Sequence, residues 1–309
     1  MIDRRLRVLR AIERHRTVTA AAEVCGLTPS AVSHQMQALA RELDVVLLEP
    51  AGRGVRLTAA ARTLLAHAGT LAAQWERARA DLAAHRGGEV GGVLRFCAFS
   101  TAAAAVVPPA LARLRRAHPA LRLHLRETEP ARAFDLLAAD DTDVVVVVAT
   151  PDIPPTSDEA FDQQVLFDEP LDLLVGPRHP VVGRADVALD ALASDPWICA
   201  SPGRAYHQLV VLACTSAGFA PDVAHYADEW DTGAALVARG FGVALVPRLA
   251  ELPTRHDTRR VPIGAPPVPI RRVVAAVRAG SREQPTIAAG LEALRLVCAA
   301  LATTLGAQA

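Results

Sequence analysis

One predicted helix, over residues 29–43, presents hydroxyl, imidazole and amide groups along a single face. This polar face carries Ser30, Ser33, His34 and Gln37. Thr28 is a good N-cap, and Pro29 suits the first helical position, where the missing N–H of proline costs nothing. Short hydroxyls at a helix N-terminus bind phosphate, whereas imidazole and amide groups hydrogen-bond to base edges. The pattern predicts contact with DNA, and solvated helix surface is the alternative.

The elements around this helix predict a winged helix-turn-helix over residues 1–58. An apolar stripe with helical spacing predicts a first helix, and Gly26 allows a tight turn before the polar-faced helix. Two short apolar runs, residues 45–48 and 55–57, flank a glycine-rich tip that carries Arg53. Such runs predict a β-hairpin, so we expect a wing with an arginine at its tip.

The charged residues are distributed unevenly along the chain. Its 309 residues include 33 arginines, no lysine and 33 acidic residues, for zero formal net charge. The lack of lysine excludes a Schiff-base lysine for pyridoxal phosphate and a Walker A nucleotide site. Residues 1–86 carry 13 arginines against 8 acidic residues, whereas residues 87–309 carry 20 against 25. A basic head on an acidic body is typical of a nucleic-acid-binding module joined to another domain, with chance clustering as the alternative.

Residues 59–86 predict one long helix, because the segment contains no proline and is dominated by alanine, leucine and arginine. Its apolar residues alternate spacings of four and three, which is the seam of a coiled coil. The seam consists of Leu64, Ala68, Leu71, Trp75, Ala78 and Leu82. We expect this helix to join copies of the chain, and the alternative is a helix packed on its own domain. The glycines of residues 87–92 then predict a hinge.

From residue 93 onward, predicted strands and helices alternate, which indicates an α/β architecture. Residues 143–149 are almost entirely apolar, as a strand buried in a parallel sheet requires. The order of elements resembles the two-lobed periplasmic-binding-protein architecture, which holds a ligand in a cleft between its lobes. We predict a first lobe of residues 93–168 and 271–309 and a second lobe of residues 169–270.

The N-terminal motifs resemble the DNA-binding domain of LysR-type transcriptional regulators. The matching positions are Ala21-Ala22, Ala31-Val32-Ser33 with Gln35, Leu39, Leu43, Leu47 and Leu57-Thr58. Later motifs follow the family in the same order, at residues 117–119 (AHP), 178–180 (RHP) and 236–247 (LVARGFGVALVP). The chain departs from the family at His34, where a basic residue is commonest, and at Pro50, where the family has arginine. The resemblance therefore extends over the whole chain.

This resemblance implies a DNA-binding transcriptional regulator whose operator binding is controlled by a small-molecule effector. It assigns a set of residues to the major groove, namely Thr28, Pro29, Ser30, Ser33 and His34, with Gln37 on the same helix face. Arg53 would then reach phosphate or the minor groove. In the body, the resemblance implies an effector site at the ends of strands, between the lobes. That site would include Ser100, Thr101, Thr128, Ser201 and Pro202, with Tyr206 and Trp230 as aromatic walls. Arg204 would bind a carboxylate, and a solvated arginine is the alternative.

Three other interpretations stay open. Some LysR relatives sense peroxide through a cysteine pair, and Cys199 and Cys214 lie in the body, although their apolar neighbours favour buried, inert thiols. A protein that binds DNA without any effector is a second alternative. An enzyme is disfavoured, because the sequence has no GxSxG, HExxH or GxGxxG motif and its ten histidines lack metal-ligand spacing. We therefore expect no catalytic residues, no cofactor and no metal.

The expected partners follow from these motifs. They are double-stranded promoter DNA, a metabolite as effector, further copies of the chain in a dimer or tetramer, and RNA polymerase. The basic N-terminus lacks the apolar run of a signal peptide, and no uncharged stretch approaches the roughly 20 residues that span a membrane. We therefore expect a soluble, cytoplasmic bacterial protein with no membrane partner.

Overall fold

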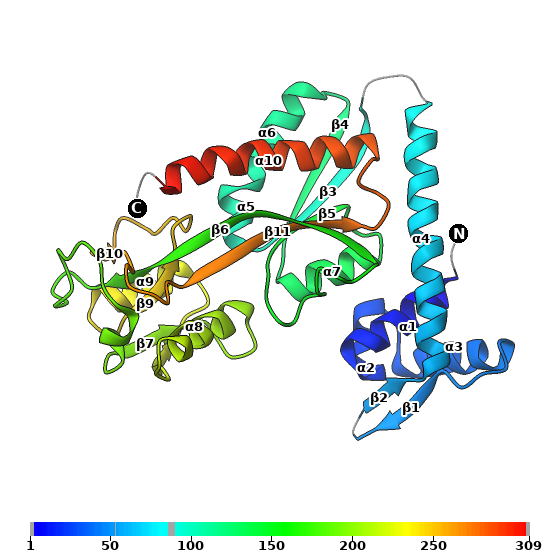
Figure 1. Cartoon of the computed structure of the whole chain (residues 1–309), viewed down its shortest axis with the longest axis horizontal. Helices are drawn as coiled ribbons and strands as arrows, with labels where there is room; N and C mark the ends of the chain where they lie inside the picture. Colours follow the sequence, from blue (N-terminus) through cyan, green and yellow to red (C-terminus); the bar gives the residue numbers. More distant parts are fainter. Residues whose placement is uncertain (1–2, 53, 86–89, 307–309) are drawn as a thin grey trace.

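A computed structural model describes residues 3–52, 54–85 and 90–306 of the chain. Figure 1 shows a small helical head at the N-terminus, one long helix that rises from it, and a larger α/β body. The architecture confirms the expected winged helix-turn-helix, long helix and mixed α/β body. In the part of the chain that the structure describes, no helix combines the length and apolar character needed to cross a membrane.

The head packs three helices around a compact apolar core. They are α1 (Arg4–His15), α2 (Val18–Cys25) and α3 (Pro29–Glu42). The N-cap side chains of Asp3, Thr17 and Thr28 each accept a hydrogen bond from a backbone N–H in the first turn. Gly26 ends α2 in the left-handed conformation at φ 65°, which turns the chain into α3. Buried apolar side chains of all three helices, among them Leu9, Ile12, Ala21, Val32 and Met36, form the core.

The wing is an antiparallel hairpin of β1 (Leu48–Ala51) and β2 (Gly54–Leu57), with Ala51 opposite Gly54. The expected first strand, residues 45–48, was placed too early. Arg53, which the sequence predicts at the tip, lies outside the described residues. The backbone of Gly54 approaches the head so closely that a Cβ would lie 2.4 Å from the carbonyl oxygen of Arg16. This contact fixes the base of the wing against the turn after α1.

Helix α4 (Ala59–Ala84) has 26 residues and would extend about 39 Å. Its first turns pack against the head, where Leu64 adjoins the apolar core and Ala68 is buried. Further along, Leu71, Trp75 and Leu82 are exposed, at 61%, 50% and 63%. The part of the predicted seam that is open to a partner therefore begins at Leu71.

The opposite face of α4 contacts the body. Glu76 is only 7% exposed and accepts hydrogen bonds from Gln284 Nε2 at 2.5 Å and Arg278 Nε at 3.3 Å. Gly280 lies against the helix so closely that a Cβ would lie 2.3 Å from the carbonyl oxygen of Ala73. The helix is thus attached to the body in its second half. Of the predicted hinge at residues 87–92, residues 87–89 lie outside the described residues.

The first half of the body is a sheet covered by helices on both faces (Figure 1). Its strands are β3 (Gly92–Ala98), β4 (Leu121–Glu127), β5 (Val144–Val148), β6 (Phe161–Val175) and β11 (Ile270–Arg278). Strand β3 pairs in parallel with β4 and β5, whereas β11 runs antiparallel to β5 and β6. The helices are α5 (Ser100–Ala105), α6 (Val107–Ala117), α7 (Pro130–Ala138) and α10 (Pro285–Gly306).

The second half of the body is built around the far end of β6. This strand has 15 residues, and its beginning packs in the first half while Leu171, Leu173 and Val175 lie in the core of the second. The remaining elements are η1 (Leu189–Leu192), β7 (Pro196–Cys199), α8 (Ala205–Ser216), β8 (Asp222–Tyr226), α9 (Trp230–Ala238), β9 (Ala244–Pro247) and β10 (Arg259–Val261). Because β6 is continuous, the predicted lobe boundary after residue 168 falls inside a strand. The predicted residue ranges of the lobes stay predictions.

Candidate DNA-binding face and effector cleft

The polar face of α3 is open to solvent. Val32, Met36 and Leu39 are buried in the head, and Ser30, Ser33, His34 and Gln37 are all exposed on the other side. The hydroxyl of Thr28 accepts the Ala31 N–H at 3.2 Å and lies 3.0 Å from the Ser30 hydroxyl. Pro29 has no N–H and Val32 N–H donates to the carbonyl oxygen of Thr28, so among the described residues the Ser30 N–H is left without a backbone or cap partner in the first turn. A negatively charged backbone would meet both this N–H group and the positive end of the helix dipole.

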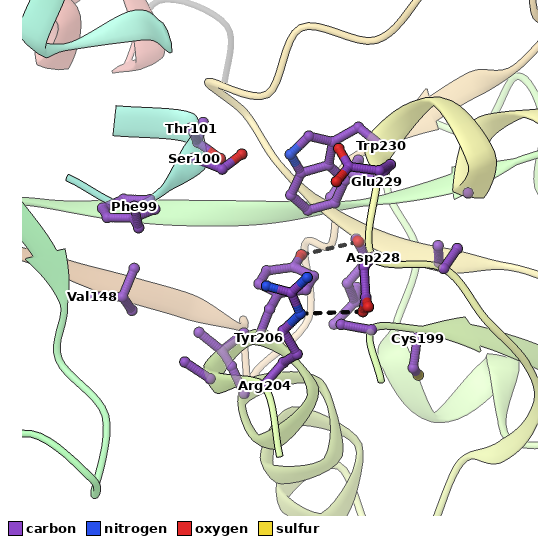
Figure 2. Close-up of a pocket in the computed structure, with 18 of the residues that line it drawn as sticks. Phe99, Ser100, Thr101, Val148, Cys199, Arg204, Tyr206, Asp228, Glu229 and Trp230 are labelled. Carbon is purple, nitrogen blue, oxygen red and sulfur yellow. Dashed lines mark hydrogen bonds and ion pairs between the residues drawn. The ribbon is translucent and has the colours of Figure 1, made fainter. Parts of the chain in front are cut away.

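A cavity of about 390 Å³ opens between the two halves of the body. Six of the predicted effector residues line it, namely Ser100, Thr101, Thr128, Arg204, Tyr206 and Trp230. Figure 2 shows Ser100 and Thr101 on one side and Arg204, Tyr206 and Trp230 on the other. Ser100 and Thr101 start α5 one residue after β3 ends, and Thr128 follows β4, so that parallel strands bring these hydroxyls to one edge of the sheet.

Ser201 and Pro202 do not line this cavity. The Ser201 backbone N–H and hydroxyl donate to the two carboxylate oxygens of Asp228, at 2.8 and 3.0 Å. These bonds, the backbone N–H first, hold the pKa of Asp228 below its ordinary value. Ser201 therefore fixes a lining carboxylate instead of facing the cavity itself, and Pro202 is exposed on the adjoining turn.

Arg204 connects the two halves of the body. Its Nη1 lies 2.5 Å from Oε1 of Glu129, which precedes α7, and its Nε lies 3.4 Å from Oδ1 of Asp228. Hydrogen bonding to Glu129 raises the pKa of the guanidinium. Figure 2 shows Arg204 extending toward Asp228. The group predicted to bind a ligand carboxylate is thus already engaged by two carboxylates of the chain.

Aromatic rings form one wall of the cavity. The rings of Tyr206 and Trp230 meet edge to face, with centroids 5.1 Å apart. The Tyr206 hydroxyl donates to the carbonyl oxygen of Leu245 at 3.0 Å, and burial raises its pKa far above the ordinary value. Tyr206 is therefore a neutral, fixed wall.

The inner part of the cavity contains a charged pair that sequence reasoning missed. Arg271, 2% exposed, lines the cavity and lies opposite Glu169, 0% exposed, in the register of β11 and β6. The Arg271 Nε donates to Glu169 Oε2 at 2.6 Å, and the guanidinium lies 5.0 Å from the ring centroid of Phe99. Both strands carry several charged residues, and nothing in the sequence singles out this pair or brings together residues 102 positions apart.

The two cysteines of the alternative interpretation are buried and free. Cys199 lines the cavity, and Cys214 lies in the same apolar core. Burial raises the pKa of Cys199 to about 11 and that of Cys214 to about 12. A thiol must ionise to attack peroxide, so both are poor nucleophiles at neutral pH.

The head also contacts the body through α7. Asp135, 6% exposed, lies 2.9 Å from Arg14 Nη1 and 3.1 Å from His15 Nε2, both in α1. The Arg7 guanidinium donates to the carbonyl oxygen of Ala139 at 2.9 Å. Since Glu129 immediately precedes α7, this helix reaches from the interlobe cavity to the head.

Two models of known protein families match the chain. Residues 4–62 match the bacterial regulatory helix-turn-helix protein, lysR family, and residues 87–299 match the LysR substrate binding domain. The chain belongs to the LysR family of transcriptional regulators. Both parts of the sequence-based identification, a DNA-binding head and an effector-binding body, are thereby confirmed.

Similar proteins include other LysR-type regulators. The probable HTH-type transcriptional regulator LrrA of Synechococcus elongatus is 30% identical, over 94% of this chain and 95% of its own. A hydrogen peroxide-inducible genes activator of Dickeya chrysanthemi is 28% identical, over 80% and 79%. A Corynebacterium glutamicum OxyR variant, solved with hydrogen peroxide bound, shares the fold with a TM-score of 0.62 at 24% identity, over 98% and 95% of the two chains.

Proposed function

We propose that this LysR-type regulator binds operator DNA through α3 and the wing, and that a small-molecule effector in the interlobe cavity alters this binding. The observation that carries the proposal is the position of α7. Its N-terminal neighbour Glu129 binds Arg204 across the cleft, and Asp135 binds Arg14 and His15 of the head. A ligand that stabilises one interlobe angle over another would move α7 and hence the head.

In this proposal, Thr28, Pro29, Ser30 and Ser33 contact phosphates, and His34 and Gln37 read base edges. Arg53 contributes a phosphate contact from the wing. Exposure of the polar face of α3 and the free N–H of Ser30 at its start support this division. The protein acts by binding, in the cytoplasm and with RNA polymerase as a later partner, and it catalyses no reaction.

Two heads must act together, because operators of helix-turn-helix proteins have two half-sites on one face of DNA, spaced by whole turns of about 34 Å. The exposed Leu71, Trp75 and Leu82, with Ala78 between them, would pair two α4 helices. The effector is then expected to change the length of the footprint or the bend of the DNA more than the affinity of one head.

The test is footprinting of the full chain with and without an effector identified by a thermal-shift screen of metabolites. Thr101→Val keeps the shape of a buried lining residue and removes its hydroxyl. It should weaken the effector response by about 1–3 kcal/mol and leave basal DNA binding intact, since a ligand polar group loses its partner. Thr215→Val, on an exposed face of α8, is the matched control. An unchanged effector response in Thr101→Val would remove Thr101 from the site.

A peroxide-sensing function is the second candidate, because several relatives are named as hydrogen peroxide-inducible genes activators. In this chain it would rest on Cys199 and Cys214. Mild peroxide treatment followed by mass spectrometry decides it. An intramolecular disulfide between these cysteines, together with an altered footprint, would establish thiol sensing in place of a bound effector. A footprint that no metabolite and no oxidant alters would establish the effector-independent alternative.

A further inference from the structure

The mouth of the interlobe cavity has an excess of negative charge. Four carboxylates line it, Glu127, Glu129, Asp228 and Glu229, against the one cation Arg204 near the surface. Arg204 is engaged by Glu129 and Asp228. Within the described residues, Glu127 and Glu229 form no ion pair, and Glu229 makes no capping bond at the start of α9. Both carboxylates are exposed, so a ligand can reach them.

The lining of the cavity includes a buried hydrogen-bond donor without a partner in the part of the chain that the structure describes. Arg271 is 2% exposed and lines the cavity, and Glu169 already neutralises its charge through Nε. Its Nη2 is buried and has no hydrogen-bond partner among the described residues. A buried N–H without an acceptor is unfavourable, and a ligand oxygen would satisfy it. Since the Arg271–Glu169 pair is neutral, a carbonyl or hydroxyl oxygen is sufficient, and no anion is needed.

Between these ends, Trp230 adjoins Glu229 in sequence, and Figure 2 shows the two side chains together on one side of the cavity. Tyr206 meets Trp230 edge to face, at 5.1 Å between ring centroids. An aromatic ring beside unpaired carboxylates favours an organic cation, because the ring face and the carboxylates both attract positive charge. A free carboxylate in the same position would face four carboxylates and only one arginine, itself already engaged.

We propose that the effector is an organic cation with an oxygen acceptor, such as an amine-bearing amide, ester or alcohol. Its ammonium group lies against Trp230 and Glu229, with Glu127 nearby, and its oxygen accepts from Nη2 of Arg271. This assignment rests on the proposed effector function of the cavity and specifies the chemical class of the ligand.

The experiment compares three probes that share one benzene ring. At about pH 6, where both amines are protonated, L-phenylalaninamide has an ammonium and a neutral carbonyl, and phenethylamine has only the ammonium. 3-Phenylpropionate has a carboxylate and no ammonium. Binding to the full chain is measured by titration calorimetry and by the shift in unfolding temperature. We expect phenylalaninamide to bind roughly tenfold more tightly than phenethylamine, because only the amide supplies an oxygen to Arg271. The propionate should not bind.

The role of Arg271 is tested by comparing phenylalaninamide with phenethylamine, which differ in the oxygen that Arg271 would bind. Replacing Arg271 itself would leave Glu169 buried without its partner and endanger folding. The charge at the mouth is tested with Glu229→Gln, which should weaken binding of both amines roughly fivefold. Glu251→Gln, at an exposed position outside the cavity lining, is the control and should leave their binding unchanged.

A second measurement requires no ligand. In a Trp75→Phe background, Trp230 is the accessible tryptophan, since Trp197 is fully buried. Caesium should quench its fluorescence more strongly than iodide, and Glu229→Gln should reduce the difference. Stronger quenching by iodide would overturn the proposal. So would binding of 3-phenylpropionate as tight as that of the amines, or no binding of any probe.

The DNA footprint is recorded with the same probes and with the metabolite hits. An anionic compound that alters the footprint would overturn the cationic class while leaving the proposed effector function in place. If no cavity ligand of any class alters the footprint, although the amines bind, the proposed function fails and the assignment of the ligand class stands.

Discussion

The proposed DNA-binding face and the proposed effector cleft of this regulator are built in opposite ways. The polar face of α3 comes from residues close together on one helix, and the fold only has to bury the other side of that helix. The cleft takes its lining from strands, helices and loops between Phe99 and Arg271. On the polar face of α3 the side chains are exposed to solvent. In the cleft, most of the charged side chains already form ion pairs with one another. A local site depends on helix periodicity, and a site assembled from distant segments depends on the tertiary structure.

The largest effect is expected for the exposed part of α4, which lies between the two regions. Replacing Leu71 and Trp75 together with Glu should abolish dimerisation, because charge would be buried in an apolar seam. Light scattering should give the mass of a monomer, with the circular dichroism spectrum unchanged. Gln74→Glu, at an exposed position beside the seam, is the control. If the double variant keeps the parental mass, α4 does not join the subunits.

The contact between head and body is expected to have the next largest effect. Asp135→Asn removes the negative charge that forms an ion pair with Arg14 and a hydrogen bond with His15 Nε2, at a cost of about 1–3 kcal/mol. The variant should still bind the effector, measured by calorimetry, but its footprint should respond less. Asp141→Asn, at an exposed position just after α7, is the control. An undiminished footprint response would mean that coupling bypasses α7 and follows α4 alone.

A smaller effect is expected at the wing. Arg53→Ala should weaken binding to all DNA sequences alike and lower the slope of log affinity against log salt by about one, as loss of one phosphate contact does. Ser33→Ala and His34→Ala should instead change the preference among operator sequences. Competition binding at several salt concentrations separates the two behaviours. If Arg53→Ala leaves both affinity and salt slope unchanged, the wing tip does not contact DNA.

The smallest effect is expected for the thiols. With pKa values of about 11 and about 12, Cys199 and Cys214 should resist alkylation by iodoacetamide at pH 8, where about one Cys199 in a thousand is ionised. The thiols ionise near pH 9 in the unfolded chain and at higher pH in the folded chain. The folded state therefore holds their protons more tightly, and these groups stabilise the fold below pH 9. That contribution is lost as the pH rises toward 11. Peptide mapping that finds Cys199 alkylated at pH 8 would show an accessible thiol and favour the redox alternative.

The sequence by itself determined the family, the order of the parts and the composition of the α3 face. Each of these depends on local signals, such as the Thr28 cap, the apolar stripe of a helix or the glycines after α4. It also indicated Ser100, Thr101 and Thr128, because strand ends in a parallel sheet meet at one edge. Their joint contact with a ligand stays a prediction.

Only the tertiary structure decided which residues share the cleft. In the folded chain, Ser201 donates a hydrogen bond to Asp228, and Arg204 forms an ion pair with Glu129. Arg271 lies beside Glu169 on the neighbouring antiparallel strand. It also showed that Ala68 is buried within the chain, so that only the later part of the predicted seam is exposed. The physical reason is that periodicity reports which face of an element is buried, while the choice of neighbour depends on register and packing between segments far apart in the chain.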